Sequence, residues 1–194
     1  MDKFSYAIGL GIGQNLLGMG AKGIAVEDFA QAIKDVLEGN PTAISHQEAR
    51  EIVNKYFEEL EQKMNAASIE QGKAFLEENK KRAGIVTLPS GLQYEVITEG
   101  KGKLAKATDQ VKCHYEGTLI DGTLFDSSIK RGQPAVFGVN QVIPGWVEAL
   151  QLMPEGSKWK LYIPSDLAYG AQGAGEMIPP HSTCLLYTSP SPRD

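Results

Sequence analysis

The stretch VKCHYEGTLIDGTLFDSS, residues 111–128, decides the fold of the second half of the chain. Apolar and polar side chains alternate along its first part, which is the period of a half-buried β-strand. The apolar positions are Val111, Cys113 and Tyr115. Asp121 and Gly122 follow, and this dipeptide favours a hairpin turn because it tolerates positive φ. The stretch therefore predicts an antiparallel hairpin, with the second strand over residues 123–126.

The same period of two continues on both sides of this hairpin. Further strands are predicted over residues 92–98, 135–139 and 159–163. One short amphipathic helix lies between the last two, with Pro144 at its start and Pro154 as its stop. Several antiparallel strands with a single helix describe an α+β domain.

Everything before Leu88 is predicted to be helical. Residues 4–19 and 26–37 each carry apolar side chains every three to four positions, although glycines dilute the first of these segments. A capping box over residues 45–48 begins a third helix, which continues to a terminator at Gly84. At about 1.5 Å per residue it makes a rod of roughly 55 Å, longer than a small domain is wide.

The first two helices are too short to bury a core of their own. Chains of about 45 residues usually need a metal, disulfides or a partner chain, and the sequence offers neither of the first two. We therefore expect these helices to interlock with those of a second copy; the alternative is that they fold back onto the second half of the chain. The predicted organisation is a helical dimerisation region (1–44), a connecting helix (45–84), an α+β domain (88–189) and an aberrant tail (190–194).

Composition excludes several classes of protein. With 42% hydrophobic and 22% charged residues, the 194-residue chain has material for a core and is not disordered. A formal charge of −5 has the wrong sign for a protein that neutralises phosphates, so no nucleic-acid partner is expected. The apolar run over residues 7–19 is interrupted and glycine-rich, hence a poor export signal, and no membrane span is expected. A cytoplasmic location is favoured over a periplasmic one.

No motif indicates metal, cofactor or nucleophilic chemistry. The histidines at 46, 114 and 181 are scattered, and the cysteines at 113 and 184 form no zinc-ligand pattern. The glycines at 18, 20 and 23 have dinucleotide-binding spacing, but no strand is predicted before them, which favours helix packing. Walker A and serine-nucleophile sequences are absent. We therefore predict no metal and no cofactor.

Aromatic residues and prolines beside turns are the distinctive feature of the second half. They occur in five strings, HYEG (114–117), GTLFDSS (122–128), VIPGW (142–146), LAYG (167–170) and IPPH (178–181). In this order and spacing the strings closely resemble the FKBP-type peptidyl-prolyl isomerases, over residues 91–183. The helical half resembles the dimeric bacterial branch that contains the macrophage infectivity potentiator proteins.

The resemblance implies a fold and a site. The fold would be an antiparallel half-barrel sheet wrapped on one short helix, after an all-helical dimerisation region. A substrate proline would enter a cup with the indole of Trp146 as its floor. The other residues of the cup would be Tyr115, Phe125, Phe137, Val142, Ile143 and Tyr169, with Ile178 walling it from the following loop. The catalytic contacts would come from the N–H of Ile143, the hydroxyl of Tyr169 and the carboxylate of Asp126.

The implied reaction is cis–trans isomerisation of X-Pro bonds in unfolded or partly folded polypeptides, without a covalent intermediate. Macrocyclic inhibitors of the family are further candidate ligands. The alternative is a chaperone or peptide-binding module that uses the same pocket without useful catalysis. A proline-peptide assay separates the two hypotheses.

The sequence departs from the family pattern after Thr183. The family has an alternating apolar strand here, with an aromatic residue facing the ligand where this chain has Leu186. Pro190 and Pro192 lack the N–H that a central strand needs, so pairing is predicted to end by Ser189. The remaining residues resemble a truncated or foreign end.

Overall fold

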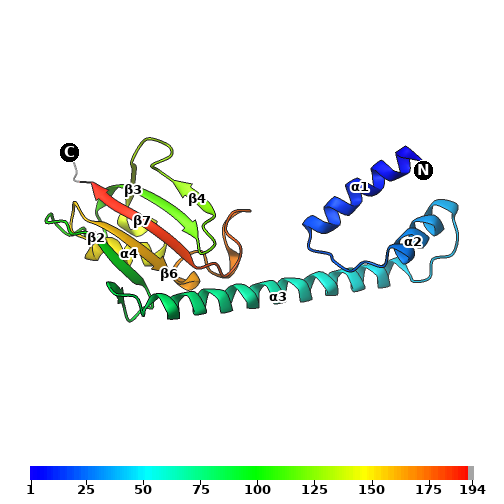
Figure 1. The fold of residues 1–194 in the computed structure, drawn as a ribbon, viewed down its shortest axis with the longest axis horizontal. Coiled ribbons are helices and arrows are strands. Elements are labelled where there is room, and N and C mark those ends of the chain that lie inside the picture. The colour runs from blue at the N-terminus through cyan, green and yellow to red at the C-terminus, as the bar shows by residue number, and fades with distance from the viewer. Residues whose placement is uncertain (192–194) are drawn as a thin grey trace. The chain divides into compact units, whose positions relative to one another are not determined.

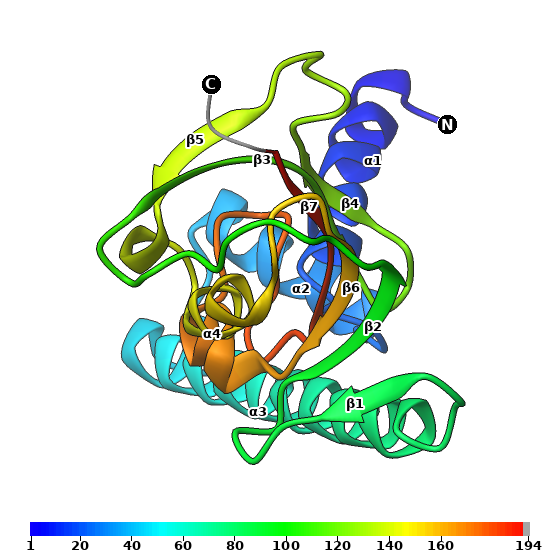
Figure 2. The same ribbon diagram turned by 90° about the vertical axis from the view of Figure 1, so that its left-hand side faces the viewer.

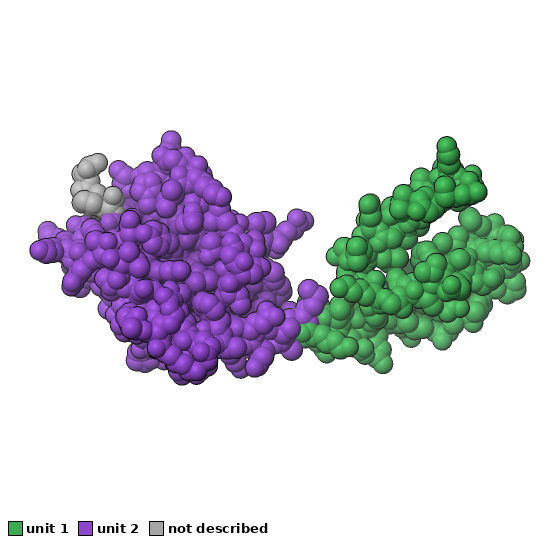
Figure 3. Space-filling view, viewed as in Figure 1, with its two compact units in different colours: residues 1–63 green, residues 64–194 purple. Residues whose placement is uncertain are grey.

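The computed structural model describes residues 1–191, and the chain divides into two compact units, residues 1–63 and 64–194 (Figure 3). The boundary between the units lies within the longest helix, α3 (His46–Asn79). The first half of α3 therefore belongs to the N-terminal unit, and its second half belongs to the unit that contains the β-sheet.

The N-terminal unit consists of helices at the predicted positions. α1 spans Lys3–Gly18 and α2 spans Val26–Glu38, which ends at Gly39 in the left-handed conformation. The hydroxyl of Ser45 accepts a hydrogen bond of 3.1 Å from the N–H of Glu48, so the predicted cap of α3 is confirmed. Neither α1 nor α2 contains a buried residue. This unit therefore has no developed core of its own.

One strand of the sheet was not predicted. α3 ends at Asn79, and β1 (Ile85–Thr87) pairs antiparallel with β2 (Gln93–Thr98), placing Ile85 opposite Glu95. The prediction that everything before Leu88 is helical is wrong for these residues. Three residues are too few to show an alternating pattern, and the strand is stabilised by backbone pairing with β2.

The second unit contains a seven-stranded antiparallel sheet (Figure 1). Its remaining strands are β3 (Gln110–Leu119), β4 (Leu124–Ser127), β5 (Ala135–Gly138), β6 (Lys158–Ile163) and β7 (Cys184–Ser191). The strand order is β1-β2-β6-β7-β3-β4, and β5 also pairs with β3. The predicted hairpin between β3 and β4 is present, and Gly122 has the expected positive φ of 87°.

The concave side of the sheet holds the short helix α4 (Pro144–Leu152), as Figure 2 shows. Trp146, Ala149 and Leu150 of α4 are buried in the main hydrophobic cluster. Alternate residues of the strands supply the other side of that cluster, including Cys113, Leu161 and Leu186. This packing places the first turn of α4 against the inner face of the sheet.

β7 is longer than predicted and lies between β6 and β3. Pro190 pairs with Cys113 of β3, so the prediction that pairing ends by Ser189 is wrong. The pairing of β7 with β6 ends where Thr188 lies opposite Trp159. Pro190 thus has a partner strand on one side only, where its missing N–H is tolerated. Pro192 lies outside the described residues.

No helix within residues 1–191 is long and apolar enough to cross a membrane. The same residues contain no group of three histidine, cysteine, aspartate or glutamate side chains placed to hold a metal ion.

Candidate active site

Three aromatic rings from three different elements meet on the inner face of the sheet. Trp146, in the first turn of α4, is 7% exposed. The ring of Tyr115 from β3 lies 5.0 Å from the indole at an interplanar angle of 63°. The ring of Phe137 from β5 lies 4.7 Å from it at 57°. Such tilted contacts are favourable and rigid, so the three rings hold one another in place.

A second pair of rings lies on the same cavity. Phe125 of β4 and Tyr169 meet edge to face, with centroids 6.1 Å apart and planes at 84°. Behind them Ile178, 5% exposed, forms a small cluster with Leu119 and Cys184. Ile178 does not line the cavity, so it supports this wall from behind instead of forming its surface.

The rings enclose a cavity of about 310 Å³. Its lining consists of Tyr115, Phe125, Asp126, Phe137, Gln141, Val142, Ile143, Trp146, Ile163, Tyr169, Cys184 and Leu186. All of the predicted site residues except Ile178 are in this set. Gln141, Ile163 and Cys184 were not predicted. The alternation of Trp159, Leu161 and Ile163 places Ile163 on the core face, and that signal could have found it.

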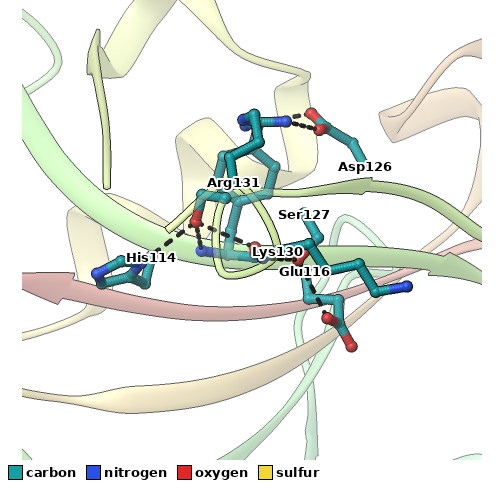
Figure 4. Close-up of polar contacts among 8 residues, drawn as sticks. His114, Glu116, Asp126, Ser127, Lys130 and Arg131 are labelled. Atoms are coloured by element: carbon teal, nitrogen blue, oxygen red, sulfur yellow. Dashed lines mark hydrogen bonds and ion pairs between the residues drawn. The ribbon is translucent and has the colours of Figure 1, made fainter. Parts of the chain in front are cut away.

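The polar edge of the cavity is a network of three side chains. The hydroxyl of Tyr115 donates a hydrogen bond of 2.5 Å to Oδ2 of Asp126 and accepts one of 2.8 Å from Nη2 of Arg131. Arg131 also forms an ion pair with Asp126, and Figure 4 shows the two groups facing each other. The sequence analysis did not identify Arg131. This residue lies in a loop five positions after Asp126, where no helical or strand period predicts the direction of a side chain.

This network holds the three groups in defined protonation states. Burial acts to raise the pKa of Asp126, but hydrogen bonds from Tyr115 and Arg131 outweigh it, so the pKa lies below its ordinary value. Burial raises the pKa of Tyr115, and the hydrogen bond to Asp126 adds to this. Burial likewise raises the pKa of Tyr169. At neutral pH the site therefore contains one carboxylate, one guanidinium and two neutral phenols.

Two further polar groups belong to residues that line the cavity and have no hydrogen-bond partner in the described part of the chain. Within residues 1–191, neither the N–H of Ile143 nor the hydroxyl of Tyr169 has a hydrogen-bond partner. The carbonyl of Ile143 accepts hydrogen bonds from Trp146 (2.9 Å) and Val147 (3.0 Å), which fixes this peptide at the start of α4. Burial raises the pKa of the Cys184 thiol to about 12, so it is an uncharged part of the wall.

His114 lies one residue before Tyr115 on β3, and its side chain does not line the cavity. Its Nδ1 lies 3.4 Å from the hydroxyl of Ser128, in the polar cluster of Figure 4. Neighbouring strand residues point to opposite faces of a sheet, which explains the separation of His114 from the rings.

Known proteins match this chain over most of its length. The family described as FKBP-type peptidyl-prolyl cis-trans isomerase matches residues 101–188, and the domain amino-terminal to that isomerase matches residues 1–96. The FKBP-type 22 kDa peptidyl-prolyl cis-trans isomerase of Escherichia coli (strain K12) is 50% identical over 186 residues, covering 94% of this chain and 90% of that protein. The outer membrane protein MIP of Legionella longbeachae is 42% identical over 192 residues, covering 95% and 82%.

A solved structure shows the same arrangement of elements. The crystal structure of FkpA from Escherichia coli matches with a TM-score of 0.80 and 32% identity, and the match covers 98% of this chain and 94% of that one. The cup of aromatic rings is thus found in a chain that matches isomerases along nearly its full length. The chain belongs to the FKBP-type peptidyl-prolyl cis-trans isomerases that carry an FKBP_N domain, and it catalyses cis–trans isomerisation of X-Pro bonds.

Proposed function

We propose that the cavity above Trp146 accelerates isomerisation by holding the prolyl ring in a dry aromatic site. Rotation about an X-Pro bond breaks amide resonance, with a barrier of about 18 to 20 kcal/mol. The planar amide is more charge-separated than the twisted one, so an apolar site disfavours the ground state relative to the transition state. The observation that carries the proposal is the cavity of about 310 Å³ formed around Tyr115, Phe137 and Trp146.

The polar groups are proposed to orient the peptide around that ring. The N–H of Ile143 and the hydroxyl of Tyr169 would donate to substrate carbonyls, since both lie on the cavity without a partner. Each such bond contributes about 0.5 to 1.5 kcal/mol net. Asp126, held by Tyr115 and Arg131, would face the twisting amide as a fixed carboxylate. No proton transfer and no covalent bond to the enzyme are needed.

The test is a cis–trans exchange assay on a short proline peptide. We expect turnover by the full chain, and competition by a macrocyclic inhibitor that carries a proline-like ring. Suppression of aggregation of an unfolded protein is measured beside it. Aggregation suppression without any isomerase activity would support the peptide-binding alternative and contradict the catalytic role of the cavity.

The same protonation states predict a flat pH profile. Asp126 has a lowered pKa and stays ionised as the pH falls through its ordinary value, whereas Tyr115 and Tyr169 have raised pKa values and stay neutral as the pH rises. We expect kcat/KM for a peptide without titratable side chains to be constant between about pH 5 and about pH 9. Below this range the value should fall, because protonation of Asp126 breaks its ion pair with Arg131. A midpoint near the ordinary histidine pKa would contradict this assignment.

We propose that residues 1–44 mediate homodimerisation, with the residues from 45 to 84 as the connector to an isomerase domain that begins near residue 88. α1 and α2 bury no side chain within this chain, and many of their large apolar residues are exposed, including Phe4 (74%) and Leu37 (80%). Monomeric proteins rarely expose so much apolar surface, and a second copy would cover it. Size-exclusion chromatography with light scattering should give twice the chain mass of 21.0 kDa.

We also propose that the protein works in the cytoplasm on unfolded chains. Its two cysteines, Cys113 and Cys184, are free and buried, as is usual in a reducing compartment. Cell fractionation with an antibody to the chain tests this, and recovery in the periplasmic fraction would overturn it.

A further inference from the structure

The second half of α3 lies directly against the loop that follows the aromatic cup. The hydroxyl of Ser68 donates a hydrogen bond of 3.2 Å to the carbonyl of His181. One turn further along, Gly72 is buried, and a methyl group at its Cα would overlap the hydroxyl of Thr183. Both contacts lie within the unit of residues 64–194. The helix backbone thus approaches the chain at the point where it enters β7.

This loop contains a residue in an uncommon backbone conformation and is held by backbone hydrogen bonds. His181 has a φ of 58°, in the left-handed region that residues other than glycine rarely adopt, and its N–H donates to the carbonyl of Gly170 at 2.9 Å. Ala174 and Ile178 exchange two backbone hydrogen bonds of 2.9 and 3.2 Å. A strained residue persists when its surroundings over-determine it, and here part of those surroundings is Ser68.

The loop in turn supports a wall of the cavity. Gly170 directly follows Tyr169, which lines the cavity, and Ile178 packs with Cys184 behind the rings of Phe125 and Tyr169. A continuous series of contacts therefore runs from α3 through the His181 peptide to Tyr169. Loops without such support move independently of the sheet that they leave.

We propose that Ser68 and Gly72 of α3 are positioning residues, which hold the loop from Tyr169 to Thr183 so that Tyr169 lines the substrate cavity with Ile178 packed behind it. The proposal rests on the role assigned above to Tyr169 in binding substrate. Under it, the second half of α3 supports the isomerase site, although the isomerase domain itself begins near residue 88.

Other contacts of α3 allow the loop contact to be removed without displacing the helix. Near the C-terminal end of α3, Nδ2 of Asn79 donates to Oε1 of Gln93 at 2.9 Å, and the Phe75 ring lies 6.1 Å from that of Tyr162. These contacts hold the helix on the sheet without Ser68. Ser68→Ala therefore removes the loop contact and leaves the helix in place. Gly72→Ala inserts a methyl group at the contact with Thr183, although alanine is the better helix former.

The experiment compares full-length variants by peptide isomerisation and by amide hydrogen exchange. For Ser68→Ala and Gly72→Ala we expect KM to rise about two- to fivefold with little change in kcat, because the wall that binds substrate is loosened while the floor is intact. Exchange at the amides of Ala174, Ile178 and His181 should speed up about two- to tenfold. Ser68→Thr keeps the hydroxyl and should restore both values, and Thr183→Ala should relieve Gly72→Ala.

Lys73→Ala is the matched control, because Lys73 is an exposed neighbour on the same helix. Wild-type KM and exchange in both Ser68→Ala and Gly72→Ala would overturn the proposal, as would equal changes in Lys73→Ala or faster exchange across the whole sheet. Faster loop exchange with an unchanged KM would also overturn the proposal. That result would show that the contact with α3 holds the loop but has no effect on substrate binding. If the catalytic role of the cavity itself were wrong, variants of Trp146 would keep wild-type activity, a result independent of Ser68.

Discussion

Replacing Trp146 with alanine is expected to lower kcat/KM for a proline peptide by at least about tenfold, a loss of about 1.4 kcal/mol or more in transition-state stabilisation. The indole contacts both Tyr115 and Phe137 and forms the buried floor of the cavity. Without it the rings lose their support and water enters the site. The effect should lie mainly in kcat, because a wet cavity no longer favours the twisted amide.

Stability must be separated from catalysis in this variant. Removal of a buried tryptophan costs about 3 to 5 kcal/mol of folding free energy, so thermal unfolding is measured for each protein. Trp146→Phe keeps a ring at the floor and should retain more activity than Trp146→Ala at equal folded fraction. His114→Ala is the control, since His114 lies on the same sheet but off the cavity. Equal activity of the His114 and Trp146 alanine variants would argue against this cavity as the site of reaction.

Replacing Gly13 with leucine is expected to convert the proposed dimer to monomer at micromolar concentration. A shallow groove runs along α1, with Gly9 and Gly13 at its base and Tyr6, Leu10 and Leu17 beside it. A Cβ atom added at either glycine would have no atom of another part of this chain within 4 Å. We infer that a helix of the second copy lies in this groove, because small residues spaced by four allow close helix approach.

The direction of this effect distinguishes packing from helix stability. Leucine is a better helix former than glycine by up to about 1 kcal/mol, so Gly13→Leu should strengthen α1 in isolation. Weaker dimerisation with equal or greater helicity by circular dichroism therefore indicates a blocked contact. Gly11→Leu makes the same change on the other side of α1 and should weaken the dimer less. A dimeric mass for Gly13→Leu would contradict docking in this groove.

The periodic parts of the fold could be predicted because their signals are local. The hairpin follows from Asp121 and Gly122, and α4 follows from an apolar face between Pro144 and Pro154. The cup followed from the family resemblance, and its rings do meet at one cavity. In each case either a short-range rule or the resemblance of five sequence strings to the family predicts where the residues lie.

The features that could not be predicted all depend on contacts between segments that are distant in the sequence. Gln93 is a polar residue between apolar neighbours in the predicted strand over residues 92–98, yet it is 3% exposed, because Asn79 of α3 hydrogen-bonds to its side chain. Arg131 joins the site through the fold of a loop, which no period describes. Pro190 extends β7 because β6 has already ended beside it. None of these neighbours can be identified from spacing along one chain.

The position of β7 has a consequence for how the domain is made. β7 follows β6 and β3 in the chain yet lies between them, so a nascent polypeptide that stops before Cys184 holds two separate half-sheets with unpaired inner edges. Such edges template association with other strands, and pairing over long sequence separations is slow. During synthesis, the nascent isomerase is therefore prone to aggregate until β7 leaves the ribosome and pairs with both half-sheets.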